Sequence, residues 1–108
     1  SKHVATALLA VNKKYVKIQS AINIKYRNEI ISKIKKCQFT TYDYDRNQEP
    51  KNVKYEGSSI EWGIQSAIKN SKKQPDVIYH KGDMGKEPMI IVFGETPNDV
   101  IKKILKII

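Results

Sequence analysis

The sequence predicts an α/β fold, because segments with helical periodicity alternate along the chain with short β-prone segments. The chain has 108 residues, of which 40% are hydrophobic and 29% are charged. This length suits one domain, and this balance is typical of a globular protein rather than a disordered chain. No apolar run reaches the roughly 20 residues that span a bilayer, and no segment has the pattern of a signal peptide. We therefore expect one α/β module without a membrane segment.

The first half of the chain predicts two helices and two strands. Apolar residues recur at i, i+4 and i+7 over about residues 3–13, which predicts an amphipathic helix. Residues 16–24 carry valine, isoleucine and alanine and predict a strand. A second helix is expected over about residues 26–36, with three isoleucines as its buried stripe. Residues 38–44 are rich in Thr, Tyr and Phe, which favour a strand.

The second half begins with a polar segment, residues 45–57, whose Asn, Pro and Gly predict a loop. Ser58 is then expected to open a helix, with Glu61 three residues later as its capping-box partner. Two short strands are expected over Val77–His80 and residues 89–93, because both segments are predominantly apolar.

The last predicted helix has the clearest start. Thr96 is a good N-cap, Pro97 suits the first helical position, and Asp99 complements the positive end of the helix. Four apolar side chains are expected to face the core from this helix: Ile101, Ile104, Leu105 and Ile108.

The chain is strongly basic, with a formal net charge of +9 from 20 Lys and Arg against 11 Asp and Glu. Such a surplus suits nucleic acid, an anionic membrane or phosphorylated small molecules. A composition rich in Lys and Ile is also typical of AT-rich genomes and of hyperthermophile proteins. The lysines are scattered, without an Arg-rich arm or an aromatic stripe. Direct nucleic-acid binding is therefore the weaker interpretation of the charge, and we expect no nucleic-acid contact by this segment.

Few residues are available for redox, zinc or hydrolase chemistry. Cys37 is the only cysteine, so no internal disulfide can form, and a lone thiol fits a reducing cytoplasm. His3 and His80 are the only histidines, and without a Cys pair or HxxxH spacing no zinc site is expected. No Gly-x-Ser-x-Gly elbow supports a serine hydrolase.

The most informative stretch connects the last two predicted strands. Gly82 and Gly85 let the backbone turn and approach a ligand closely, and exposed N–H groups in such a turn can hold an anion. Lys86 adds a point charge suited to phosphate. Asp83 and Glu87 suit a hard cation such as Mg²⁺, which prefers one or two carboxylates plus phosphate oxygens. The same pattern is also that of a plain hairpin loop, and it lacks the spacing and helix of a Walker A loop.

Other polar residues stand at the ends of predicted strands or at a helix start. His3 lies at the N-terminus of the first helix, where N–H groups attract anions. Asn23 and Lys25 stand at a strand-to-helix junction, and Arg46 follows another strand. His80 closes a third strand, and its imidazole suits proton transfer near neutral pH. Because α/β folds carry ligand contacts at such junctions, we hypothesise that the four basic residues converge on one anionic ligand.

Read in order, five segments of the chain resemble the ThiN family of thiamine-phosphate synthases. The most specific is Gly-Asp-x-Gly-Lys-Glu-Pro-Met at residues 82–89, and the order and spacing of the others add to it. The segments are SKHVA (1–5), AINIKY (21–26), YDR (44–46), EGSSIEWG (56–63) and DVIYHKGDMGKEPMI (76–90).

The resemblance covers essentially the whole chain, and family members are longer. We therefore interpret residues 1–108 as the C-terminal part of a single ThiN-like domain. The resemblance implies a three-layer α/β/α fold with a mixed sheet, similar to that of class II aldolases. It also implies a fused upstream hydroxymethylpyrimidine kinase domain. A truncated sheet would expose an edge, which we expect to pair with the missing part or with another subunit in a homo-oligomer.

The resemblance also implies an activity and roles for site residues. The enzyme would join hydroxymethylpyrimidine diphosphate to hydroxyethylthiazole phosphate in the cytoplasm, giving thiamine phosphate and pyrophosphate, with Mg²⁺ and no organic cofactor. His80 is assigned a proton or phosphate role. Lys86 is assigned, with the turn at residues 82–85, to the diphosphate, while Lys25 and Arg46 would bind the other phosphate.

Two alternatives to catalysis stay open. Lys2 and Lys25 stand where many relatives are expected to carry arginine, and lysine keeps the charge but loses the bidentate geometry. Some ThiN-like domains are fused to DNA-binding domains and sense thiamine phosphates without catalysis, so a sensing domain of a transcriptional regulator is one alternative. An unrelated small-molecule or interaction module is the other.

Overall fold

The structure is a computed structural model that describes residues 2–50 and 56–108. Helices and strands alternate along the chain, as the sequence predicts for an α/β fold. The elements are α1 (Lys2–Asn12), β1 (Ser20–Ile24), α2 (Asn28–Lys36), β2 (Thr41–Asp43), the 3₁₀ turn η1 (Arg46–Gln48), α3 (Glu56–Ile68), β3 (Val77–His80), β4 (Met89–Gly94) and α4 (Pro97–Ile107).

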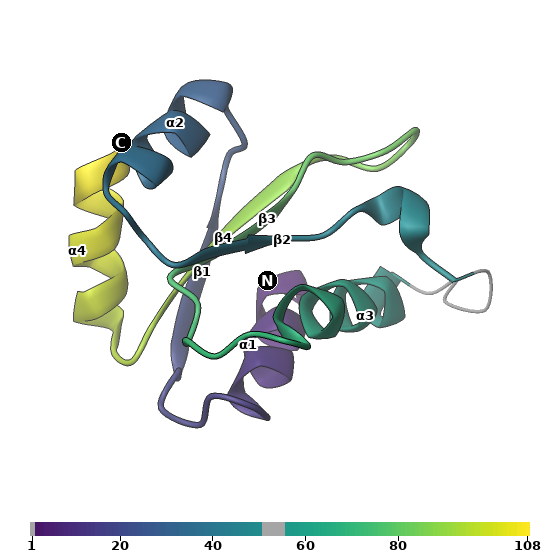
Figure 1. The fold of residues 1–108 in the computed structure, drawn as a ribbon, viewed down its shortest axis with the longest axis horizontal. Coiled ribbons are helices and arrows are strands. Elements are labelled where there is room, and N and C mark those ends of the chain that lie inside the picture. The colour runs from purple at the N-terminus through teal and green to yellow at the C-terminus, as the bar shows by residue number, and fades with distance from the viewer. Residues whose placement is uncertain (1, 51–55) are drawn as a thin grey trace.

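The four strands form one mixed sheet in the order β1-β4-β3-β2, with helices on both faces (Figure 1). β2 and β3 are parallel, whereas β4 is antiparallel to both β3 and β1. The predicted mixed α/β architecture is therefore confirmed. In the described part of the chain, no helix is long and apolar enough to cross a bilayer.

The hydrophobic core lies in two layers, one on each face of the sheet. Successive strand residues point to opposite faces, so Ile91 and Phe93 of β4 pack with α1 and α3, while Ile90 and Val92 pack with α2 and α4. All of β3 and nearly all of β4 is buried, because helices cover both faces of these two central strands.

In the first half of the chain α1 has its predicted length, whereas β1, α2 and β2 are shorter than predicted. β1 begins at Ser20 rather than at residue 16, because Asn12 Nδ2 donates to the Val16 and Ile18 carbonyls at 3.0 Å and holds a turn there. α2 begins after Arg27, and the left-handed φ of 58° at Gln38 ends it. β2 keeps only the three residues that pair with β3.

The predicted capping box before α3 is wrong. The helix begins at Glu56, so Ser58 lies inside it rather than in front of it. Glu61 instead accepts a hydrogen bond from the Nζ of Lys13, which directly follows α1, at 3.1 Å. The predicted loop over residues 45–57 contains η1 and the start of α3, while residues 51–55 lie outside the described part.

The predicted start of α4 is confirmed, because the Thr96 hydroxyl accepts from the Asp99 N–H at 3.2 Å. The predicted core face is wrong for three of its four residues. Ile104 packs on the core, but Ile101, Leu105 and Ile108 are 54%, 67% and 65% exposed, and the buried residues are Val100 and Ile107.

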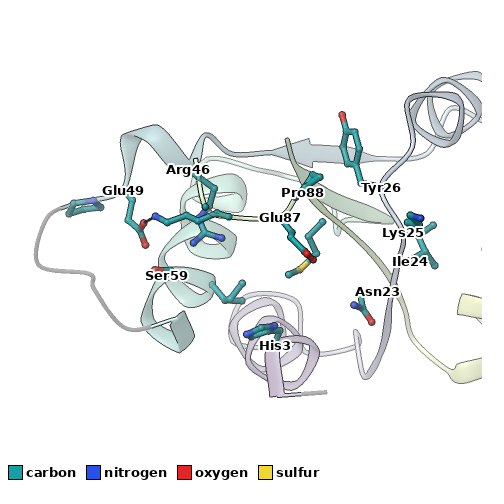
Figure 2. Close-up of a pocket in the computed structure, with 15 residues that line it drawn as sticks. His3, Asn23, Ile24, Lys25, Tyr26, Arg46, Glu49, Ser59, Glu87 and Pro88 are labelled. Carbon is teal, nitrogen blue, oxygen red and sulfur yellow. Dashed lines mark hydrogen bonds and ion pairs between the residues drawn. The ribbon is translucent and has the colours of Figure 1, made fainter. Parts of the chain in front are cut away.

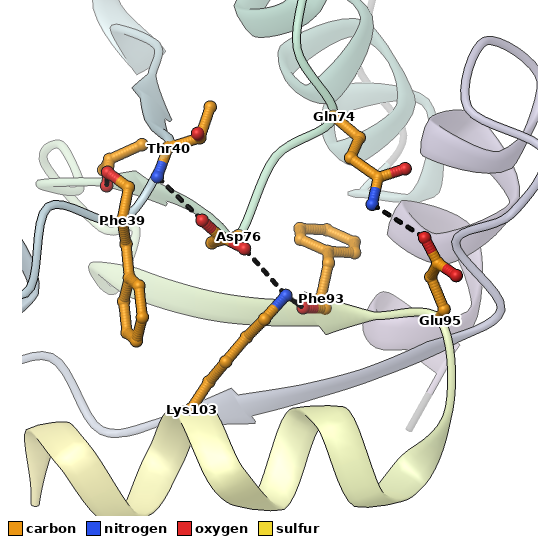
Figure 3. A network of polar contacts seen from close by, with 8 residues as sticks. Phe39, Thr40, Gln74, Asp76, Phe93, Glu95 and Lys103 are labelled. Carbon is orange, nitrogen blue, oxygen red and sulfur yellow. Dashed lines mark hydrogen bonds and ion pairs between the residues drawn. The ribbon is translucent and has the colours of Figure 1, made fainter.

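The physical reason for this error is the rotation of α4, which a polar network fixes (Figure 3). Lys103 Nζ contacts Asp76 Oδ1 at 2.8 Å and donates to the Phe93 carbonyl at 2.6 Å. Asp76 Oδ2 also accepts from the Thr40 N–H at 2.8 Å. These contacts orient α4 so that Ile101, Leu105 and Ile108 point away from the sheet.

Candidate functional site

The carboxyl ends of three strands lie at the same end of the sheet, where a pocket of about 1200 Å³ opens. β1, β2 and β3 point in the same direction, because β2 is parallel to β3 and both β1 and β3 are antiparallel to β4. Segments that leave the carboxyl ends of such strands commonly surround ligands in α/β proteins. The pocket is therefore the candidate functional site.

Residues from both halves of the chain line this pocket (Figure 2). Among the predicted site residues, it brings together His3, Asn23, Lys25, Arg46, Gly85, Lys86 and Glu87, but not His80, Gly82 or Asp83. The full lining is His3, Asn23, Ile24, Lys25, Tyr26, Arg46, Glu49, Pro50, Ser59, Ile60, Gly85, Lys86, Glu87, Pro88 and Met89.

The glycine turn is a tight hairpin that folds over its own backbone. The Asp83 N–H donates to the Lys86 carbonyl at 3.1 Å, and the Lys86 N–H donates to the Asp83 carbonyl at 2.8 Å. Gly85 has a φ of 71° at the third position of this turn, where glycine is favoured. Gly82 has a φ of 82°, and a Cβ there would lie 2.6 Å from the Lys86 carbonyl oxygen. The Asp83 and Lys86 N–H groups thus donate within the protein, and the turn brings the cationic side chain of Lys86 to the pocket.

Lys86 reaches across to a buried acid that follows β2. Its Nζ lies 2.5 Å from Glu49 Oε2, and the Glu49 side chain is only 7% exposed. Burial tends to raise the pKa of Glu49. Hydrogen bonds from Lys86 and Ser59, with the charges of Lys86 and Arg46, more than offset burial, so the pKa lies below its usual value. Glu49 is therefore an anion that holds the Lys86 ammonium in place.

Arg46 is the second cation at this end of the pocket and is only 8% exposed. Its Nε and the second oxygen of Glu49, Oε1, are buried without a well-aligned hydrogen bond in the described part of the chain. A buried charge needs polar partners, so the guanidinium of Arg46 suits an anionic oxygen of a ligand, whereas Glu49 Oε1 can accept only from a donor.

His80 lies close to Arg46 and Lys86 but does not line the pocket. It is 1% exposed, and its ring centroid is 5.1 Å from that of Tyr44. Burial, together with the positive charges of Arg46 and Lys86, lowers the pKa of His80 to about 4. The imidazole is therefore neutral at physiological pH.

Lys25 lies at the other end of the pocket. It follows β1, whereas Arg46 follows β2, and these strands are the two edges of the sheet. Three inter-strand spacings separate them, or about 14 Å at roughly 4.8 Å each. Figure 2 shows Arg46 and Glu49 on one side, Lys25 on the other, and Glu87 between them. The pocket therefore has two separate cationic ends.

Carboxylates for a metal ion are sparse. In residues 2–50 and 56–108, no group of three or more His, Cys, Asp and Glu side chains is arranged to hold one. Asp83 lies on the turn outside the pocket, and Glu87 lines it. Mg²⁺ is often held by one carboxylate and substrate phosphates; Glu49 and Glu87 both line the pocket, and because Glu49 is paired with Lys86, Glu87 is the better suited of the two.

The prediction from sequence omitted several lining residues, above all Glu49 and Ser59. Ser59 lies within one of the segments that carry the family resemblance, which was the available signal. Glu49 lies in a polar stretch, and the one sequence feature that could have indicated it is its position three residues after Arg46. Its pairing with Lys86 joins residues 37 positions apart and depends on the fold.

Comparisons with known proteins identify the family of the chain. The family model described as "Thiamine-phosphate synthase ThiN" matches residues 1–106. The chain is 41% identical over its whole length to "Thiamine-phosphate synthase ThiN" of Methanothermobacter thermautotrophicus, of which it spans 57%. It is also 39% identical over 96% of its length to "Bifunctional thiamine biosynthesis protein ThiDN" of Methanocaldococcus jannaschii, of which it spans 24%.

A solved structure supports the same assignment. The crystal structure of the C-terminal domain of a phosphomethylpyrimidine kinase superposes with a TM-score of 0.89 at 47% identity, covering 98% of this chain and 60% of that one. With the family model matched almost from end to end, the chain belongs to the ThiN family of thiamine-phosphate synthases.

Proposed function

We propose that this chain is part of a thiamine-phosphate synthase that joins hydroxymethylpyrimidine diphosphate to hydroxyethylthiazole phosphate. The observation that carries the proposal is a pocket with a cationic group at each end, in a chain of the ThiN family. Both substrates are anionic, so each end offers a counter-charge for one of them. The relatives and the solved structure are longer than this chain, and their names describe the whole proteins.

The family resemblance groups Arg46 with Lys25 for one phosphate, but Arg46 lies at the same end of the pocket as Lys86. Arg46 and Lys86 share one end with Glu49, and we assign the diphosphate to it because the planar guanidinium of Arg46 can bind phosphate oxygens in pairs while Lys86 is held beside it. Lys25 stands apart, and we assign the thiazole phosphate to it. The carbon and nitrogen that react would then meet between the ends, close to Glu87.

The chemistry needs little more than positioning and charge. The bond from the pyrimidine methylene carbon to the diphosphate oxygen breaks, and its electron pair leaves with pyrophosphate. The thiazole nitrogen donates its lone pair to the same carbon, and a thiazolium forms. Atoms and charge balance without a proton transfer. The main task of the protein is therefore to stabilise the growing charge on pyrophosphate, which Lys86 and Arg46 are suited to do.

A divalent cation that accompanies the diphosphate would have Glu87 as its protein ligand and would neutralise part of the leaving charge. We propose the cytoplasm as the compartment and an upstream kinase domain in the same polypeptide. The solved C-terminal domain of a phosphomethylpyrimidine kinase, and the bifunctional Methanocaldococcus relative of which this chain spans 24%, support the upstream kinase domain. We also propose that residues 1–108 form the C-terminal part of one class II aldolase-like domain. The mixed sheet with helices on both faces supports it.

The test is a two-substrate turnover assay on the full-length protein. Formation of thiamine phosphate and pyrophosphate supports the proposal, and Lys86→Ala is expected to raise the KM for the diphosphate substrate and to lower kcat. Tight binding of thiamine phosphate without turnover would assign the protein to ligand sensing instead. Unchanged turnover and affinity in Lys86→Ala would remove the glycine turn from the mechanism.

A further inference from the structure

His80 makes a hydrogen bond that defines its protonation state. Its Nδ1 accepts from the Gly82 N–H at 3.0 Å. A ring nitrogen that accepts a hydrogen bond carries no proton, so the imidazole is neutral with its proton on Nε2. The ring is 1% exposed and does not line the pocket. His80 therefore reaches the site only through the backbone that it holds.

That backbone is the base of the glycine turn. Gly82 is held by His80, and the next residue, Asp83, exchanges two hydrogen bonds with Lys86. The turn is thus fixed at its base by an imidazole and at its tip by backbone pairing. Lys86 Nζ links the turn to Glu49, which lies 37 positions earlier in the sequence. A shift at Gly82 would therefore move Lys86 relative to the pocket.

The surroundings of His80 favour the neutral ring. Tyr44 packs against it, and the charges that act on it are the cations Arg46 and Lys86. A proton on Nδ1 would break the bond to Gly82. It would also place a positive charge on a buried ring close to Arg46 and Lys86, which burial and repulsion both oppose.

We propose that His80 is a positioning residue, whose neutral imidazole anchors Gly82 and so sets the turn that carries Lys86 to the diphosphate end of the pocket. It neither touches the substrate nor transfers a proton. The inference rests on the proposed function for the role of Lys86, and the reaction written above requires no acid or base.

The test compares two variants of the full-length protein. His80→Asn keeps a side-chain acceptor close to the position of Nδ1 but cannot titrate, whereas His80→Leu fills the space without an acceptor. We expect His80→Asn to keep kcat within about threefold and to leave the pH profile unchanged. We expect His80→Leu to raise the KM for the diphosphate substrate about tenfold, as for one lost hydrogen bond. The KM for the thiazole phosphate should not change.

Two results would show that His80 takes part in the chemistry rather than positioning the turn. A loss of about 100-fold or more in kcat for His80→Asn, with both KM values unchanged, would make His80 a general acid or base and would overturn the proposal. Nuclear magnetic resonance of the parent protein is a second measurement that does not depend on activity or on the folding of His80→Leu. It should show an unprotonated Nδ1 and a protected Gly82 amide at neutral pH. A protonated Nδ1 would also overturn the proposal.

Failure of the proposed function would look different. The parent protein would then form no thiamine phosphate, while the state of His80 could still be measured. Calorimetric titration with inorganic pyrophosphate would take the place of turnover. His80→Asn should bind it like the parent, and His80→Leu should bind it about tenfold more weakly. Equal binding by all three proteins would refute the positioning role.

Discussion

Two lysine–glutamate ion pairs should contribute unequally to stability, because they differ in burial. Lys86 Nζ lies 2.5 Å from Glu49 Oε2, and the side chains are 37% and 7% exposed. Lys13 Nζ lies 3.1 Å from Glu61 Oε1, and the side chains are 65% and 45% exposed. The second pair is thus a matched control within the same chain. Replacing each lysine by methionine removes the charge and keeps most of the side-chain volume.

The expected costs follow from these exposures. Removing one partner of a fully buried pair costs roughly 3–5 kcal/mol, because the other charge stays buried and unpaired. Lys86 is more than a third exposed, so water screens the interaction and we expect about 1–2 kcal/mol for Lys86→Met. For Lys13→Met we expect a change within about 0.5 kcal/mol. Combining Lys86→Met with Glu49→Gln should recover part of the loss, because no unpaired carboxylate remains.

The assay is urea unfolding followed by the fluorescence of Trp62, which is the only tryptophan in the chain. Its ring packs edge-on against Tyr44 at 6.2 Å, so it should report the loss of tertiary structure at this side of the pocket. A midpoint for Lys86→Met that matches the one for Lys13→Met would refute the reasoning, since burial would then have no effect. A double variant less stable than Lys86→Met would contradict the role given to the unpaired carboxylate.

Three further predictions follow from the same region. Gly63→Ala should destabilise the protein by about 2 kcal/mol, because the added methyl would overlap the Tyr44 ring; an unchanged thermal midpoint would contradict this. Lys25→Met should raise the KM for the thiazole phosphate alone, whereas Lys86→Met should raise that for the diphosphate substrate; equal effects on both would contradict two separate ends. The pKa of His80 falls from 6.5 in the unfolded chain to about 4 in the fold. The neutral ring therefore contributes fully to the free energy of unfolding above pH 6.5, and this contribution is lost as the pH falls towards 4. The loss should be about 3 kcal/mol, and urea unfolding across this range should show it in the parent but not in His80→Asn.

Local features of the fold could be predicted because their causes lie within a few residues. Thr96 and Pro97 define the start of α4 through a cap and a fixed φ, and both act on neighbouring backbone groups. Gly82 and Gly85 signalled a turn because few other residues adopt a positive φ. The strand Val77–His80 agrees with its prediction, since both faces are buried and the segment reads as continuously apolar.

Features that depend on distant partners could not be predicted. The orientation of α4 is one example, because Ile101 and Val100 are equally apolar. Val100 is turned inward and Ile101 outward by tertiary contacts, among them those of Lys103 with Asp76 and the Phe93 carbonyl. The true start of α3 is another example, because Ser58 has the local pattern of a cap and yet lies inside the helix.

The candidate site divides in the same way. The residue types at strand ends and in the glycine turn can be read from the amino-acid order, and they predict an anion-binding site. Which groups share an end of the pocket follows from the packing of the strands, which places Lys86 with Arg46 and Glu49, and Lys25 apart from them. The physical reason is the order of the strands. A chain fixes the chemistry of each residue locally, but β1 and β2 become opposite edges of a sheet only when β3 and β4 pair between them.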